Sequence, residues 1–221
     1  MALTTKDILI EKIAEKDKGY LLTRDILRAG ISHVYFYDFL ERHPEYTRQE
    51  NGVYINESIV TPDYFYILSL HKKKLIFCGM SACYLLGLTG SVFLPSLYEV
   101  TFPSGYNRNR LKGKETGSDL FIEGKNLKVF YAKPKDMEAG SFFASTPLGH
   151  EVKVYQKEKA ICQVIKNKND YEPKLYRTVI RSFFSDPNVH TMQLTSFARE
   201  YKVYEQVMDY INLFYDIFAP N

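Results

Sequence analysis

The stretch EYTRQENGVYI, residues 45–55, decides the fold of the first part of this chain. It holds two short runs in which apolar and polar residues alternate, which is typical of strands that bury one face. The dipeptide Asn51-Gly52 lies between the runs. Asn-Gly is a strong signal for a tight hairpin turn, because both residues accept a positive φ. The stretch therefore predicts a β-hairpin.

Three helices are expected before this hairpin. The first spans residues 5–17, where apolar residues recur at intervals of three and four. Thr23 is expected to cap a short second helix, and Ser32 to cap a third helix over about residues 33–42. Three helices followed by a hairpin is the order of a winged helix. The tight glycine turn between the second and third helices is typical of a helix-turn-helix.

A winged helix suggests DNA binding. The N-terminal residues of the third helix would meet base edges in the major groove, while the second helix and the hairpin would contact phosphates or a neighbouring groove. Hydroxyl and imidazole groups exchange hydrogen bonds with base edges, and guanidinium groups bind phosphates. The candidate DNA contacts are Thr23, Arg24, Ser32, His33, Tyr35, Tyr37, Arg42, Arg48 and Asn51.

The charge of this segment leaves a second interpretation open. Residues 1–57 carry 8 Lys and Arg against 10 Asp and Glu, whereas the rest of the chain carries 21 against 16. A slightly acidic module fits a protein partner as well as DNA. If the partner is DNA, a basic stretch of the second domain is expected to supply further phosphate contacts. The alternative interpretation of this stretch is a solvated loop. That stretch contains Arg108, Arg110, Lys112 and Lys114.

The remaining chain is expected to form a second domain. Residues 58–62 resemble a linker, so we place a winged-helix domain at residues 1–57 and the second domain at residues 62–221. Alternating segments predict strands in its middle, and helical spacing predicts three helices at its end, the last capped by Thr195. The predicted class is α+β: an N-terminal winged helix-turn-helix, then a mixed α/β domain with a helical C-terminus.

The motifs of the common enzyme classes are missing. There is no phosphate-binding loop, no His or Cys spacing typical of a metal site, and no pair of acidic residues placed for acid–base chemistry. Residues 79–83, GMSAC, resemble a nucleophile elbow but lack its closing glycine, so Ser81 is expected to cap a helix instead. We therefore expect neither catalysis nor a cofactor or metal.

The cysteines and the hydropathy indicate a cytoplasmic protein. Cys78, Cys83 and Cys162 match no disulfide or zinc framework, so they are expected to be buried, reduced thiols. The N-terminus lacks the pattern of a signal peptide, and no apolar run approaches the roughly 18 residues that span a bilayer. No membrane partner is expected.

Several segments, taken in order, resemble a known family, the AbiE-type (AbiEi) antitoxins of bacterial abortive-infection systems. The hairpin is followed by Gly79-Met80-Ser81-Ala82, then by Gly87-Leu88-Thr89 and a strand over residues 98–103. Residues 154–164 look like the strand-to-helix step of the family, with Gln163 in place of its acidic residue. Family members often carry arginines in the recognition helix, where this chain offers histidine and tyrosines.

The resemblance implies a function for the whole chain. Such proteins are antitoxins of type IV toxin–antitoxin systems and counter a nucleotidyltransferase-like toxin, without a stable complex. They also repress their own promoter by binding double-stranded DNA at inverted repeats. Two rival interpretations stay open: a protein-binding antitoxin whose winged helix docks a partner, and an enzyme that modifies a toxin or a nucleotide.

Overall fold

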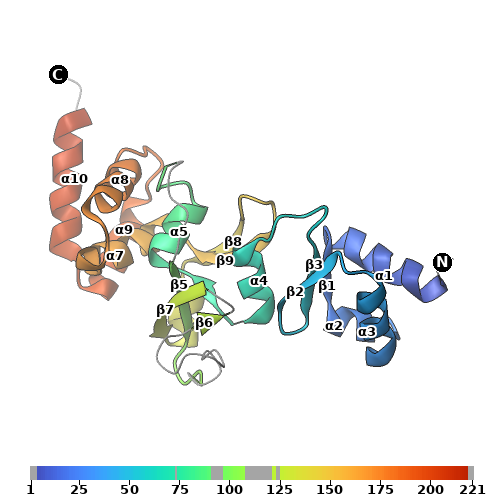
Figure 1. The fold of residues 1–221 in the computed structure, drawn as a ribbon. Coiled ribbons are helices and arrows are strands. Elements are labelled where there is room, and N and C mark those ends of the chain that lie inside the picture. Colours follow the sequence, from blue (N-terminus) through green and yellow to red (C-terminus); the bar gives the residue numbers. More distant parts are fainter. Residues whose placement is uncertain (1–3, 73, 91–96, 108–120, 123–124, 219–221) are drawn as a thin grey trace. The chain divides into compact units, whose positions relative to one another are not determined.

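The computed structural model describes residues 4–72, 74–90, 97–107, 121–122 and 125–218. The chain divides into two units, Met1–Lys73 and Lys74–Asn221, here called unit 1 and unit 2. Each unit has its own sheet and its own helices (Figure 1). The fold is therefore of the α+β class, as predicted.

The described part of unit 1 consists of helices and one antiparallel sheet with the strand order β1-β3-β2. Its elements, in chain order, are α1 (Thr5–Lys16), β1 (Tyr20–Leu22), α2 (Thr23–Arg28), α3 (His33–Arg42), β2 (Tyr46–Glu50), β3 (Val53–Asn56) and α4 (Tyr64–His71).

The predicted hairpin is present as β2 and β3, with Asn51 and Gly52 in its turn. Gly52 has a φ of 78°, whereas Asn51 is not among the described residues with positive φ. The glycine alone therefore supplies the left-handed backbone of the turn. The register shifts between Arg48 and Glu50, which is a bulge in the edge strand β2.

The small sheet buries both of its faces. Leu21 and Tyr54 point into the core that α1, α2 and α3 form on one face. Their neighbours in the strands, including Tyr20 and Val53, point to the other face and pack against Ile67 of α4. This alternation follows from the two-residue period of a strand. Figure 1 shows α1, α2 and α3 on one side of the sheet and α4 on the other.

The expected domain boundary at residue 62 is too early, because α4 belongs to unit 1. The Tyr66 hydroxyl of α4 donates a hydrogen bond of 2.8 Å to Asp17, and its ring meets Tyr20 edge-on at 5.1 Å between centroids. Ile67 is buried against the sheet. Residues 58–62 therefore connect the hairpin to α4, and the units divide after residue 73.

Unit 2 is built on a mixed sheet with the strand order β6-β7-β5-β4-β9-β8. The pairs β5–β7 and β4–β9 are parallel, and the other pairs are antiparallel. The strands are β4 (Ile76–Phe77), β5 (Leu97–Pro103), β6 (Phe121–Ile122), β7 (Lys125–Ala132), β8 (Ser141–Ser145) and β9 (Glu151–Tyr155).

The helices of unit 2 centre on α7, whose residues 158–165 are all buried. Helix α5 packs on β5 and β9, while α7 packs on α5 and is covered by α9. The described helices are α5 (Gly79–Leu85), α6 (Pro134–Glu138), α7 (Lys157–Lys166), α8 (Pro173–Phe184), α9 (Thr191–Tyr201) and α10 (Tyr204–Phe218), with a 3₁₀ turn at Lys168–Asp170.

The three cysteines are buried free thiols, as predicted. Burial raises the pKa of Cys162 to about 12 and also raises the pKa values of Cys78 and Cys83. A thiol with a raised pKa stays protonated at neutral pH and is a poor nucleophile. Within the described residues, no helix has the length and apolarity needed to cross a bilayer.

The two helix caps predicted in the middle and at the end of the chain, Ser81 and Thr195, are both wrong, because each residue lies inside a helix. Ser81 lies inside α5, which begins after Cys78, and its hydroxyl accepts a hydrogen bond from the backbone of Glu99. The helix expected from Thr195 is two helices, because Lys202 takes a left-handed φ of 61° between α9 and α10. Thr195 lies within α9 and bonds to the Met192 carbonyl. A tertiary contact overrides the capping signal at Ser81, whereas at Thr195 the helix simply begins earlier, at Thr191.

Candidate nucleic-acid interface

Helix α3 begins as predicted, with Ser32 as its N-cap. The Ser32 hydroxyl accepts a hydrogen bond of 3.3 Å from the Tyr35 backbone N–H. Phe36 and Phe39 are fully buried and attach one face of the helix to the core of unit 1. The first turn of α3 is therefore held by a cap and by packing, while its opposite face stays outside the core.

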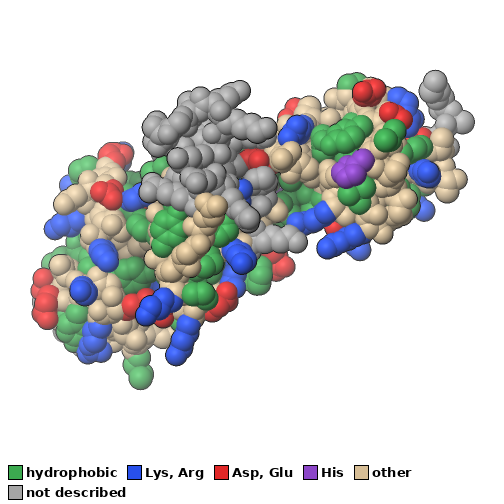
Figure 2. All heavy atoms as spheres, turned by 90° about the horizontal axis from the view of Figure 1, so that it is seen from below, with side chains coloured by type: hydrophobic (Ala, Val, Ile, Leu, Met, Phe, Trp, Pro, Cys, Tyr) green, Lys and Arg blue, Asp and Glu red, His purple; other side chains and the backbone are tan. Residues whose placement is uncertain are grey.

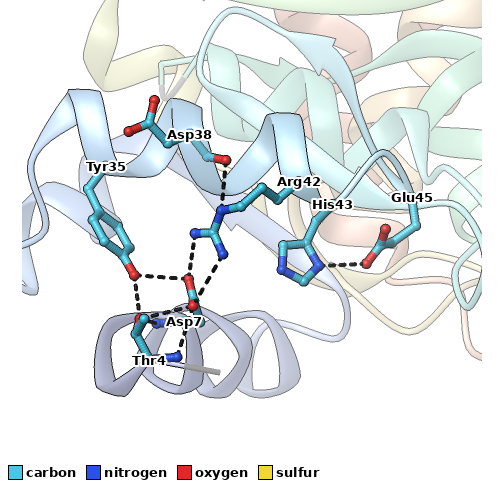
Figure 3. A network of polar contacts seen from close by, with 7 residues as sticks. All are labelled: Thr4, Asp7, Tyr35, Asp38, Arg42, His43 and Glu45. Atoms are coloured by element: carbon cyan, nitrogen blue, oxygen red, sulfur yellow. Dashed lines mark hydrogen bonds and ion pairs between the residues drawn. The ribbon is translucent and has the colours of Figure 1, made fainter. Parts of the chain in front are cut away.

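Tyr35 and Arg42, two of the candidate DNA contacts, point toward α1 and hold α3 against it (Figure 3). The Arg42 guanidinium pairs with the buried carboxylate of Asp7 at 2.9 Å, and the Tyr35 hydroxyl donates to Asp7 at 3.1 Å. The Tyr35 hydroxyl also contacts that of Thr4, the N-cap of α1. These two side chains position α3 against α1, so we do not assign them contacts with bases.

The Asp7 carboxylate is the centre of this network. The hydrogen bond from Arg42 is the main reason why its pKa lies well below the ordinary value, and bonds from Thr4 and Tyr35 lower it further against the opposing effect of burial. Asp7 also closes a capping box with Thr4 at the start of α1. One carboxylate thus begins α1 and attaches α3 to it.

The outer face of α3 carries the remaining candidates. His33 and Tyr37 lie one turn apart with stacked rings, 6.1 Å between centroids. Val34 is 71% exposed and Tyr37 49%. Figure 2 shows hydrophobic side chains gathered around a histidine on unit 1, at the right of the view. Asp38 and Glu41 are also exposed on this helix, so its outer surface is not uniformly suited to a polyanion.

The hairpin tip and the start of α2 bring three further candidates together. Thr23, Arg24 and Asn51 line one hollow of about 350 Å³ in unit 1. Thr23 begins α2 rather than capping it, because Leu22 is the N-cap and the Thr23 N–H donates to the Gly52 carbonyl at 3.0 Å. Arg48 donates a hydrogen bond of 2.6 Å to Asn51, so the two exposed hairpin residues form a pair.

The predicted basic stretch of unit 2, with Arg108, Arg110, Lys112 and Lys114, lies outside the described residues. A second group of basic residues was missed by the sequence reasoning. Lys174, Arg177 and Arg181 are exposed at helical spacing on α8, and none has an ion-pair partner among the described residues. We call this group the α8 ridge. Three cations at intervals of three and four, opposite the buried Val179 and Phe183, were the available signal.

Unit 2 contains a buried polar centre around Glu99, which is 1% exposed. Its carboxylate accepts hydrogen bonds from the Met80 N–H at 2.6 Å, from Lys128 at 3.0 Å and from the Tyr171 hydroxyl at 2.9 Å. A Cβ on Gly79, where φ is 49°, would lie 2.0 Å from the same carboxylate. Only glycine fits at this position without a shift of the carboxylate.

This centre is internally paired. The hydrogen bonds from Lys128 to Asp170 and Glu99 outweigh burial and raise its pKa, so the lysine stays charged. Burial and the charge of Glu99 raise the pKa of Tyr171, which stays a hydrogen-bond donor. The arrangement therefore orders the fold and leaves no free general base. Among the described residues, no group of three His, Cys, Asp or Glu side chains is placed to hold a metal ion.

Three of the segments that carry the family resemblance meet at this centre, namely residues 79–82, 98–103 and 154–164. Ser81 accepts a bond of 2.8 Å from the Glu99 N–H, and the Gly79 N–H donates to Gln163 at 3.2 Å. An amide side chain accepts this N–H as a carboxylate would. The glycine, the serine and Gln163, distant along the chain, are thus parts of one packing arrangement.

Comparison with known proteins finds similar solved structures but no similar sequence family. No family model matches the sequence, and no curated protein is significantly similar to it. The fold is similar to the crystal structure of the RV2827C protein from Mycobacterium tuberculosis, with a TM-score of 0.50 and 11% sequence identity. The match covers 96% of this chain and 82% of the other. At this identity the similarity concerns the fold alone.

Proposed function

We propose that this protein is a DNA-binding repressor whose unit 1 is a winged helix, with α2 and α3 as the helix-turn-helix and β2–β3 as the wing. One observation carries the proposal: Ser32, His33, Val34 and Tyr37 form an exposed face at the start of α3, while its other faces are held by Phe36, Phe39 and the Asp7 network. A rigid helix with an outward N-terminal face suits insertion into the major groove.

Phosphate contacts are assigned to cations on both units. Arg24 of α2 and Arg48 of β2 are the assigned cations in unit 1, and the α8 ridge adds three in unit 2. Unit 1 by itself is slightly acidic, so its own charge gives little electrostatic attraction to DNA. Affinity for DNA depends on the number of neutralised phosphates. We therefore assign sequence preference to α3 and much of the affinity to the cations.

The wider biological role in this proposal is that of an AbiE-type antitoxin. In this role the protein represses its own operon at inverted repeats and counters a nucleotidyltransferase-like toxin in phage defence. Support comes from the family resemblance, three of whose segments meet at one buried centre around Glu99. The protein acts as a binding protein, without catalysis, in the cytoplasm.

A gel-shift titration tests the repressor function. The probe is DNA from immediately upstream of the gene, with scrambled DNA as the control, across a series of salt concentrations. We expect selective retardation that weakens as salt rises. Replacing Arg24 or Arg48 by Ala should weaken binding to all sequences and lower the salt slope by about 1 each. Replacing His33 or Tyr37 by Ala should change the base preference at one position.

A matched variant separates base readers from positioning residues. Tyr35→Phe removes the hydroxyl that bonds to Asp7, so we expect lower thermal stability with an unchanged base preference. A changed base preference in this variant would show that Tyr35 contacts the bases in the major groove. No selective shift of the natural protein would overturn the repressor proposal.

One observation favours a second candidate, a protein-docking role for unit 1. Val34 and Tyr37 expose apolar surface on α3 beside the acidic Asp38 and Glu41, which suits a protein partner. Co-purification with the product of the neighbouring gene at high salt, lost in Val34→Lys, would support this role over DNA binding.

A further inference from the structure

Strand β8 forms an unprotected edge of the sheet in unit 2. It is last in the strand order and pairs only with β9 among the described residues, without a register shift. Its sequence, Ser-Phe-Phe-Ala-Ser, contains no charge and no proline. Phe142 is 42% exposed and Phe143 64%. Edge strands usually carry charges, prolines or bulges that prevent pairing with another chain.

The edge strand β2 of unit 1 shows such protection in the same molecule. It carries the exposed Arg48, and its register shifts between Arg48 and Glu50. A bulge bends and twists the edge away from straight pairing. Strand β8 has neither a charged side chain nor a bulge, so its edge is suited to pairing with a partner strand.

The hydrogen-bond pattern shows which groups of β8 point outward. The Gln156 N–H donates to Gly140 and the Thr146 N–H to His150, so the even-numbered residues of this segment bond toward β9. Pairs that exchange bonds alternate with pairs that do not in an antiparallel ladder. The backbone groups of Ser141, Phe143 and Ser145 therefore face the open edge, where no partner lies among the described residues.

We infer that β8 pairs antiparallel with β8 of a second copy of this chain, with a two-fold axis at Phe143. This register places Phe143 opposite Phe143 and Ser141 opposite Ser145, so all outward backbone groups of one copy meet those of the other. On the other face of the sheet, Phe142 lies opposite Ala144, a large side chain beside a small one. No charged residue of one strand opposes a like charge of the other.

The strand is thus complementary to itself, which an isologous interface requires. A strand of another protein would need no such symmetry, so the observations favour a second copy. An aromatic pair across neighbouring strands adds to the backbone bonds. The pairing joins two sheets of unit 2 into one continuous sheet. The inference is independent of the proposed DNA binding, because it concerns the protein in the absence of DNA.

Sedimentation of the full chain over a wide range of protein concentration tests the pairing. The natural protein should be a dimer in reversible equilibrium with monomer. Phe143→Lys places two lysines opposite each other at the axis and should raise the dimer dissociation constant at least about tenfold. Ile59→Lys, at a position in unit 1 that is 72% exposed, is the control and should leave the dimer unchanged.

A second variant distinguishes strand pairing from a contact between side chains. Ser145→Pro removes an outward N–H while every hydrogen bond between β8 and β9 keeps its donor. It should weaken the dimer with unchanged helix content and thermal unfolding of the monomer. A natural protein that is monomeric throughout, or a dimer that both β8 variants leave intact, would overturn the inference.

Discussion

At the scale of single residues, Tyr35 and Arg42 attach α3 to α1 through the Asp7 carboxylate. Their hydroxyl and guanidinium groups would also suit contacts with DNA, so polarity alone does not distinguish positioning residues from contact residues. His33 and Tyr37, each two residues from Tyr35, lie on the exposed face of the helix. Residues three to four apart share a face of a helix and residues two apart do not, so the distinction depends on which face meets the core.

Asp7 makes stability dependent on acid. The pKa of Asp7 in the folded protein lies below its unfolded value of about 3.9. The ionised carboxylate therefore stabilises the fold at a pH above about 3.9, and this contribution is lost as the pH falls from about 3.9 toward the folded pKa. Asp7→Asn should lower the free energy of unfolding at neutral pH by roughly 1–3 kcal/mol, since the hydrogen bonds to a charged group are weakened. The variant should also lose this part of the acid dependence.

Thermal unfolding followed by circular dichroism across acidic to neutral pH measures both effects. Asp38→Asn is the matched control, because Asp38 is exposed and only its backbone carbonyl joins the network. Equal acid dependence of the natural protein and Asp7→Asn would contradict the role given to Asp7.

At the scale of elements, amphipathic helices were the most predictable feature. Helix α8 shows what its periodic pattern revealed and what was overlooked in it. Helical spacing predicted a helix in this part of the chain, and its Val179, Ile180 and Phe183 are buried. The stripe opposite these residues forms the α8 ridge. The apolar stripe and the basic stripe recur with the same helical period on opposite faces of α8. The periodicity that predicts the helix therefore also predicts the ridge.

The α8 ridge should contribute to DNA affinity without contributing to sequence preference. Replacing Lys174, Arg177 and Arg181 together by Gln removes three cations from phosphates. The salt slope should fall by about 2 to 3, at roughly 0.9 per phosphate. Gel shifts over a salt series give the slope. Gln at Lys12, Lys16 and Lys135, three other exposed lysines, is the control; an equal fall there would mean a general charge effect.

At the scale of the whole molecule, the boundary between the units depends on a helix that sequence reasoning assigned to the wrong domain. Proline and polar residues at 58–62 resemble a linker, but α4 beyond them covers one face of the sheet in unit 1. Local composition marks where the chain turns. Which core a helix then joins depends on surfaces distant in the sequence, here Tyr20 and Val53.

Two fragments test this assignment. Residues 1–73 contain both cores of unit 1 and should unfold in one cooperative transition on heating. Residues 1–57 lack α4 and expose the sheet face that holds Tyr20, Leu22 and Ile55, so this fragment should have a lower Tm or no transition. Cooperative unfolding of both fragments at the same Tm would place α4 outside the unit 1 core.

The sequence alone determined those features that depend on neighbouring residues. These are the hairpin at Asn51-Gly52, the cap at Ser32 and the helices with clear apolar stripes, because turn, cap and periodicity signals act within a few residues. Only the tertiary structure decided the partners of Asp7 and Glu99, the place of α4, the break at Lys202 and the open edge of β8. Each of these depends on groups that are far apart in the chain and meet only when the cores form.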